Sequence, residues 1–157
     1  MGNSFWQRRI VQPVLLLLKQ GLTPEKLALT IALGIALGTV PVLGSTSIFC
    51  ALAAAALGLN QAAIQGVNYL AYPLQLALLI PFLKLGAVLF GDHGFQITFG
   101  DIQRLISSGI ISTITTLWTA TMHGIVVWGI VVIPSVTILY FVLCPVLRLA
   151  SARQNIS

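Results

Sequence analysis

The sequence contains very little charge. Eight basic and three acidic residues occur among 157, while 57% of the residues are hydrophobic and the mean hydropathy is +0.99. No formal charge occurs between Lys26 and Lys84, and none between Arg104 and Arg148. Such a composition excludes a soluble globular domain and predicts an all-α integral membrane protein.

Acidic residues and cysteines are too few, and too scattered, to indicate an enzyme or a metal protein. Cys50 and Cys144 lie in separate apolar runs, so we expect two small core residues. The sequence shows no paired carboxylates in an apolar run and no Ser/His/Asp set. Asp92, His93 and Asp101 share one polar segment, which is more typical of a solvated loop than of a metal centre. We therefore expect no catalytic residue, cofactor or metal.

Basic residues flank the apolar runs and do not form a patch. The net charge of +5 therefore does not suggest a nucleic-acid partner, and anionic lipid head groups explain it better. Because basic residues occur at both ends, we expect both termini to be cytoplasmic. Residues 1–21 resemble a signal peptide, but their apolar run is short and no small-residue cleavage site follows. An amphipathic interfacial helix fits this segment better.

The first charge-free stretch is interrupted twice. The sequences VPVLGS at 40–45 and GLNQ at 58–61 separate helical segments at about 24–39 and 46–57 from a third that begins near Gln61. At ~1.5 Å per residue, neither of the first two crosses a ~30 Å hydrocarbon core. Two short helices joined by a turn predict a re-entrant hairpin, which enters and leaves on one side. Two short, tilted spans are the alternative.

The residues around these interruptions favour helix ends. Thr23 and Asn60 are placed to cap the first and third helices, and Pro41 ends the first because it lacks a backbone N–H. Gly44 permits a sharp reversal, and Ser45 is a plausible cap for the second helix. Non-helical backbone at membrane depth is tolerated only where it is buried or lines a wet cavity. The turn is therefore a candidate site as well as a connector.

Polar side chains follow one face of the third helix. Gln61, Gln65, Asn68, Tyr72 and Gln75 recur at intervals of three and four residues. Amides are costly against lipid, so this face either bonds to another helix or contacts a solute or lipid. We expect the face and the turn to converge on one polar pocket. The candidate substrate-binding residues are Pro41, Gly44, Ser45, Gln65, Asn68, Tyr72 and Gln75.

The second half of the chain repeats this outline loosely. We expect the third helix to end at 81–86 and a polar loop to occupy 92–101. Residues 102–157 then form a second helical membrane half, with a Gly-interrupted segment, a longer helix that ends at Pro145, Arg148 and Arg153, and a basic tail. This order suggests a loose inverted repeat, which is a recurrent transporter plan. His123, inside the second apolar run, is either a proton-linked group or a neutral core residue.

A family resemblance covers residues 22–91. The chain has a proline-led, Ala/Gly-rich helix, a P-x-x-G turn at Pro41 and Gly44, and a small-residue helix that ends before Asn60. A helix containing Pro73 follows, with Tyr72 where the family pattern has Asn. This pattern resembles the bacterial membrane family known as domain of unknown function 2062. The resemblance implies the bacterial inner membrane and a multi-pass protein, but no activity.

Two classes of function fit these observations. The first is a transporter, or a protein that translocates lipid or an anionic solute, with the polar pocket between turn and helix face as its site. Such a protein would be a homo-oligomer, because one short chain encloses little space. The alternative is a non-catalytic accessory or scaffolding subunit of a membrane complex. The expected partners are membrane lipid and either further copies or another membrane-complex subunit.

Overall fold

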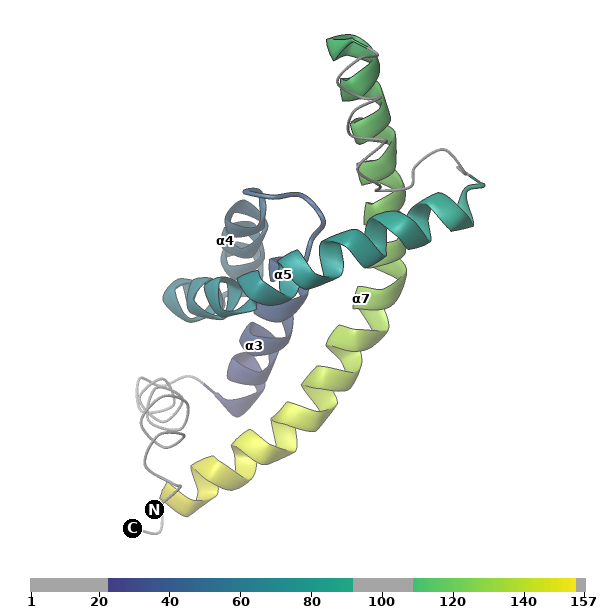
Figure 1. Ribbon diagram of the computed structural model, residues 1–157. Coiled ribbons are helices and arrows are strands. Elements are labelled where there is room, and N and C mark those ends of the chain that lie inside the picture. The colour runs from purple at the N-terminus through teal and green to yellow at the C-terminus, as the bar shows by residue number, and fades with distance from the viewer. Residues whose placement is uncertain (1–22, 92–108, 155–157) are drawn as a thin grey trace, which may run out of the picture.

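The structure is a computed structural model that describes residues 23–91 and 109–154 of the chain (Figure 1). Within these ranges the chain is all-helical, as predicted, and has no strands. The predicted interfacial helix at 1–21 and polar loop at 92–101 lie outside the described residues. The helices are α3 (Pro24–Gly38), α4 (Thr46–Leu57), α5 (Gln61–Leu89) and α7 (Ile110–Gln154).

Helix α3 has the predicted ends. The Thr23 side chain accepts a hydrogen bond from the backbone N–H of Lys26 at 3.3 Å, and Pro24 occupies the first helical position. The helix stops at Gly38, because Pro41 has no N–H with which to continue the hydrogen-bond ladder. The prediction for this helix is therefore confirmed to within one residue.

The turn after α3 reverses the chain at a glycine. Gly44 has φ +85°, a conformation that side-chain-bearing residues rarely adopt, as its position in the sequence predicted. Ser45 occupies the predicted N-cap position of α4, but its side chain does not cap the helix. Its backbone is already helical, and its hydroxyl donates to the Val42 carbonyl at 3.0 Å instead of accepting from the first turn of α4. The Val42 carbonyl, which also accepts from the Ser45 backbone N–H at 3.4 Å, competes successfully for this hydroxyl.

Helices α3 and α4 form a hairpin whose two open ends lie together. The Lys26 Nζ donates to the Gly58 carbonyl at 3.2 Å, which links the start of α3 to the end of α4. Gly58 is left-handed and ends α4, and the Asn60 side chain accepts from the Ala63 N–H at 2.8 Å to begin α5. α3 and α4 therefore form a helical hairpin, and its re-entrant placement in a membrane stays a prediction.

Helix α5 is longer than predicted. It continues through Pro73 and Pro81 to Leu89, so the expected end at 81–86 is wrong. Each proline removes one backbone donor, but both proline rings are exposed on the outer side of the helix. A helix in apolar surroundings continues past a proline because leaving the helix would expose many more unpaired backbone groups.

The described part of the second half is also one helix. α7 runs from Ile110 to Gln154 through Pro134 and Pro145, and Figure 1 shows it as a long curved helix. The expected break between a Gly-interrupted segment and a longer helix is therefore not present within residues 110–154, whereas the helix ends beyond Arg148, in the basic region where its end was expected. Within residues 109–154 nothing repeats the α3–α4 hairpin. Glycines interrupted the sequence pattern but serve helix contacts in the structure.

Helix α3 lies at the centre and contacts α4, α5 and α7. Two hydrophobic clusters hold it there. Leu27 and Ala28 pack with Cys144 and Leu147 of α7, whereas a second cluster joins α3 to α4 and α5. The second cluster contains Cys50, so each cysteine is a free, buried core residue, as predicted. This arrangement ties both halves of the chain to one short helix.

Helices α5 and α7 cross at a glycine. A Cβ built on Gly86 would lie 2.7 Å from the carbonyl carbon of His123 and 2.9 Å from the Gly124 nitrogen. Gly124 in turn faces Leu83, at 3.0 Å from its ideal Cβ. Small residues are what allow two helix backbones to approach so closely in membrane proteins.

We predict that Gly86→Ala lowers the stability of the protein by about 1–3 kcal/mol, since the new methyl group would overlap backbone atoms. Gly66→Ala, in the same helix, meets nothing within 4 Å and is the matched control. That control should stabilise the protein by about 0.5–1 kcal/mol. Unfolding midpoints in detergent measure both variants, and equal midpoints would contradict the crossing.

Candidate functional site

The polar face of α5 meets the turn at Gln75. Its side-chain amide donates to the Val40 carbonyl at 2.8 Å, and Gln75 is only 1% exposed. The same carbonyl also accepts from the Val42 N–H at 2.8 Å. The turn and the polar face of α5 therefore meet at Gln75, which bonds a carbonyl next to Pro41, whereas the expected polar pocket stays a prediction.

Trp128 of α7 satisfies a second group at the end of α3. Its indole N–H lies 3.2 Å from the Ala36 carbonyl and 3.4 Å from the Thr39 hydroxyl oxygen. Sequence reasoning missed this residue. Two signals could have found it: a buried indole needs an acceptor, and a helix that stops in apolar surroundings leaves carbonyls without donors.

A second polar cluster joins α5 to the first turn of α4. The Gln65 amide donates to the Ser47 carbonyl at 2.8 Å. The Asn68 amide lies 3.3 Å from the Ser47 hydroxyl and 3.4 Å from the Gln65 side-chain oxygen. Asn68 is buried and packs against Gly38 of α3. These amides bind the hairpin to α5, which is the interhelical role that the sequence left open.

The remaining candidate residues do not join these clusters. Tyr72 is half exposed, and Gly44 faces open space at the tip of the turn. Ser45 bonds within the turn itself, while Pro41 is buried there. Gln61, which also belongs to the polar face, is exposed. The seven candidates thus divide into buried residues between helices and outward residues, and their role in substrate binding stays a prediction.

His123 lies at the α5–α7 crossing. Its ring stacks on Phe90, with ring centroids 4.2 Å apart and an interplanar angle of 9°. Among the residues that the structure describes, no hydrogen-bond partner reaches its buried Nδ1. No three His, Cys, Asp or Glu residues of the described ranges come together as metal ligands.

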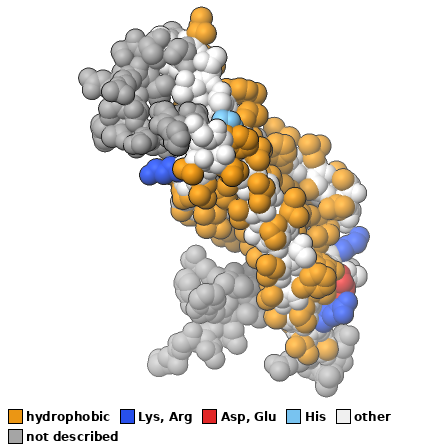
Figure 2. Space-filling view, turned by 90° about the vertical axis from the view of Figure 1, so that its right-hand side faces the viewer, with side chains coloured by type: hydrophobic (Ala, Val, Ile, Leu, Met, Phe, Trp, Pro, Cys, Tyr) orange, Lys and Arg blue, Asp and Glu red, His pale blue; other side chains and the backbone are white. Residues whose placement is uncertain are grey.

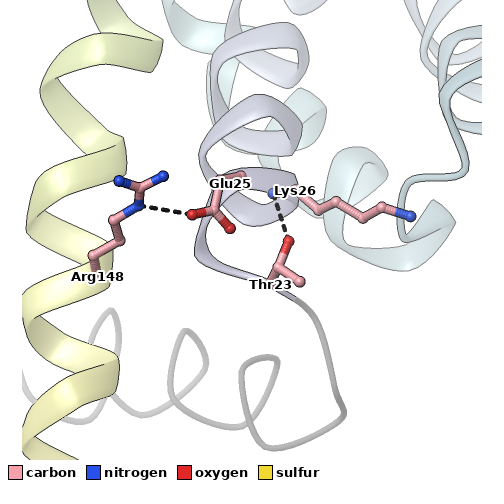
Figure 3. Close-up of polar contacts among 4 residues, drawn as sticks. All are labelled: Thr23, Glu25, Lys26 and Arg148. Carbon is pink, nitrogen blue, oxygen red and sulfur yellow. Dashed lines mark hydrogen bonds and ion pairs between the residues drawn. The ribbon is translucent and has the colours of Figure 1, made fainter.

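The charged side chains of α3 and α7 mark one end of the molecule. The Arg148 Nε donates to a Glu25 carboxylate oxygen at 2.7 Å (Figure 3). Lys26 points to the other side of α3, toward the α4–α5 connection (Figure 3). Hydrogen bonds from its own backbone N–H and from Arg148 lower the pKa of Glu25, which keeps the carboxylate ionised at neutral pH.

An apolar groove of about 190 Å³ lies between α3, α5 and α7. Sequence analysis did not predict it, because its lining comes from three helices far apart in the chain. The two hydroxyl groups of the lining donate to their own helices: Thr39 to the Ala36 carbonyl at 2.8 Å and Ser135 to the Val131 carbonyl at 2.7 Å. The lining residues are Ala32, Ile35, Ala36, Thr39, Leu74, Leu78, Phe82, Val131, Val132, Ser135, Val136 and Leu139.

A comparison with protein-family models agrees with the sequence resemblance. Residues 7–155 match the model of domain of unknown function 2062, which is described as an uncharacterized protein conserved in bacteria. The chain belongs to this family. The match extends well beyond residues 22–91, so α7 is part of the family fold as well as the hairpin and α5. No curated protein and no solved structure matched the chain.

We predict that Gln75→Leu destabilises the protein by about 0.5–1.5 kcal/mol, because the Val40 carbonyl loses one of its two donors. Gln61→Leu changes an exposed glutamine of the same face and serves as the control. Thermal unfolding in detergent compares the two. If both variants unfold at the wild-type temperature, the bond to the turn contributes nothing to stability.

Proposed function

We propose that this protein is a multi-pass protein of the bacterial inner membrane. Two helices, Gln61–Leu89 and Thr113–Ala152, are long and apolar enough to cross a bilayer. Hydrophobic side chains cover most of the face seen in Figure 2, and the charged side chains visible there lie toward opposite edges of it. The family is bacterial, which supports the choice of membrane.

The charged residues fit the two surfaces of such a membrane. Glu25, Lys26 and Arg148 lie at one end. Lys84 is exposed near the α5–α7 crossing, where Gly86 contacts His123. Between His123 and Arg148, α7 rises about 38 Å at ~1.5 Å per residue. That length lies between the ~30 Å hydrocarbon core and the ~40–45 Å of a whole bilayer.

The hairpin stops short of the second surface. Helix α3 starts at the end marked by Glu25, and its 15 residues rise about 22 Å. The turn at 40–45 then lies inside the bilayer, where its carbonyls need donors from the protein. Gln75 donates to the Val40 carbonyl of the turn, and Trp128 donates to the Ala36 carbonyl at the end of α3. The hairpin is therefore proposed to be re-entrant, with the observed hydrogen bonds supporting a buried turn.

Within this membrane arrangement we assign a transport function: translocation of lipid or an anionic solute. The observation that carries the proposal is the open groove between three helices at the end of α3, beside a turn that this arrangement would place inside the bilayer. Transporter folds use short, interrupted helices to bring backbone groups to a site at this depth. The Glu25–Arg148 ion pair holds the ends of α3 and α7 at one surface, which supports termini on the same, cytoplasmic side.

A second function is favoured by a different observation. The side-chain amides of the polar face donate hydrogen bonds to other parts of this chain, as those of Gln65, Asn68 and Gln75 do. A polar face used in this way holds a fold together without any solute. Large apolar residues such as Leu70 and Ile111 remain more than 80% exposed and would suit a partner subunit. On this alternative the protein is an accessory or scaffolding subunit.

Reconstitution separates the two functions. We predict that liposomes containing the protein move a fluorescent phosphatidylglycerol between leaflets faster than protein-free liposomes, measured by dithionite quenching of the outer leaflet. Gly44→Val should slow this movement, because valine strains the left-handed turn, whereas Gly66→Ala should not. Movement equal to that in protein-free liposomes would contradict translocation of lipid and favour the accessory function.

A further inference from the structure

We infer that the groove between α3, α5 and α7 binds the acyl chain of a phospholipid whose phosphate lies at Arg148. The inference rests on the proposed membrane function and narrows it to one substrate class. It differs from the polar pocket that the sequence suggested, because the groove lining contains none of the seven candidate residues.

Between two contacts with α3, helix α7 is curved with its concave side toward α3 (Figure 1), and the groove lies on that side. Trp128 forms the upper contact through its bond to Ala36, and Cys144 and Leu147 form the lower contact with Leu27 and Ala28. Pro134 lies between them and is exposed on the outer side of α7. A proline bends a helix and normally lies on its convex side, so the bend bows α7 outward at the groove.

The lining matches hydrocarbon and not a polar solute. The hydroxyl donors of Thr39 and Ser135 are already used within their own helices, and the other lining residues are apolar. Apolar cavities do not hold water, whereas they readily take apolar ligands. Ser135 lies about 20 Å along α7 from Arg148, which is near the middle of a ~40–45 Å bilayer. Acyl chains fill the membrane at that depth.

Arg148 provides the charge for the head group. Its Nε is bound to Glu25, and the two terminal nitrogens point away from that carboxylate (Figure 3). Its side chain is 63% exposed, so a head group at the surface can approach it. Guanidinium groups form short, charge-assisted hydrogen bonds to phosphate oxygens. Lys26 points to the other side of α3 and does not share this position.

Photo-crosslinking tests the acyl-chain position. The protein in nanodiscs is irradiated with a phosphatidylglycerol that carries a diazirine near the end of one acyl chain, and the labelled peptides are identified. We expect label on groove residues such as Leu78, and at least a tenfold loss in Val132→Trp, which fills the groove. Val142→Trp adds the same side chain on an exposed face of α7 and should keep the wild-type pattern. Equal labelling of all exposed apolar residues would overturn the inference.

Two further measurements make the outcome specific. Arg148→Gln should reduce the preference for phosphatidylglycerol over diacylglycerol several-fold without changing which residues are labelled, and an unchanged preference would overturn the head-group assignment. Unfolding midpoints check that Val132→Trp is folded. If that variant does not fold, the crosslinking is done with Pro134→Ala in its place and with Pro145→Ala as the control. Groove labelling without lipid movement in liposomes would defeat the proposed translocation alone. Movement without groove labelling would defeat only this inference.

Discussion

The structure depends on how the hydrogen-bonding groups at the end of α3 are paired. Pro41 stops the helix after about four turns, so its last carbonyl groups accept hydrogen bonds from outside the regular helical ladder, as the Ala36 carbonyl does from the Thr39 N–H and hydroxyl. Gln75 reaches the Val40 carbonyl from α5, and Trp128 reaches the Ala36 carbonyl from α7. The polar side chain that donates each bond would itself be costly against lipid if it were unpaired. One hydrogen bond therefore pairs both the side-chain donor and the carbonyl. Both long helices are thereby fixed to the turn.

The position of this turn determines how α7 and α4 are arranged. With Trp128 holding one point of α7 and the hydrophobic cluster around Cys144 holding another, the bend at Pro134 leaves a groove between them. The α4 helix is bound separately, through Ser47 and Lys26, and its return brings the hairpin ends to one surface. The buried turn and the apolar groove are therefore consequences of the same interrupted helix, and the proposed handling of lipid uses both.

Much of the fold could be predicted from the sequence. The hairpin helices, the caps at Thr23 and Asn60, the left-handed glycine and the small buried cysteines all follow from local chemistry. The long helices could not, because a proline or glycine looks the same in sequence whether it ends a helix, as Pro41 does, or only bends it, as Pro134 does. That choice depends on the donors available nearby. For the site, the amide face was predictable from its spacing, whereas Trp128 and the groove arise from contacts between helices far apart in the chain.

The depth of the 40–45 turn in the membrane is the direct test of the proposed re-entrant hairpin. A spin label at Leu43, at the exposed tip, and another at Leu149, beside Arg148, can be compared in nanodiscs by their collision rates with oxygen and with a nickel chelate. Cys50 and Cys144 are first replaced by alanine. A re-entrant hairpin predicts that the Leu43 label collides often with oxygen and rarely with the nickel chelate. It would lie about 20 Å below the surface at which Leu149 lies. A Leu43 label as accessible to nickel as the Leu149 label would show that the turn reaches water, and the re-entrant arrangement would be wrong.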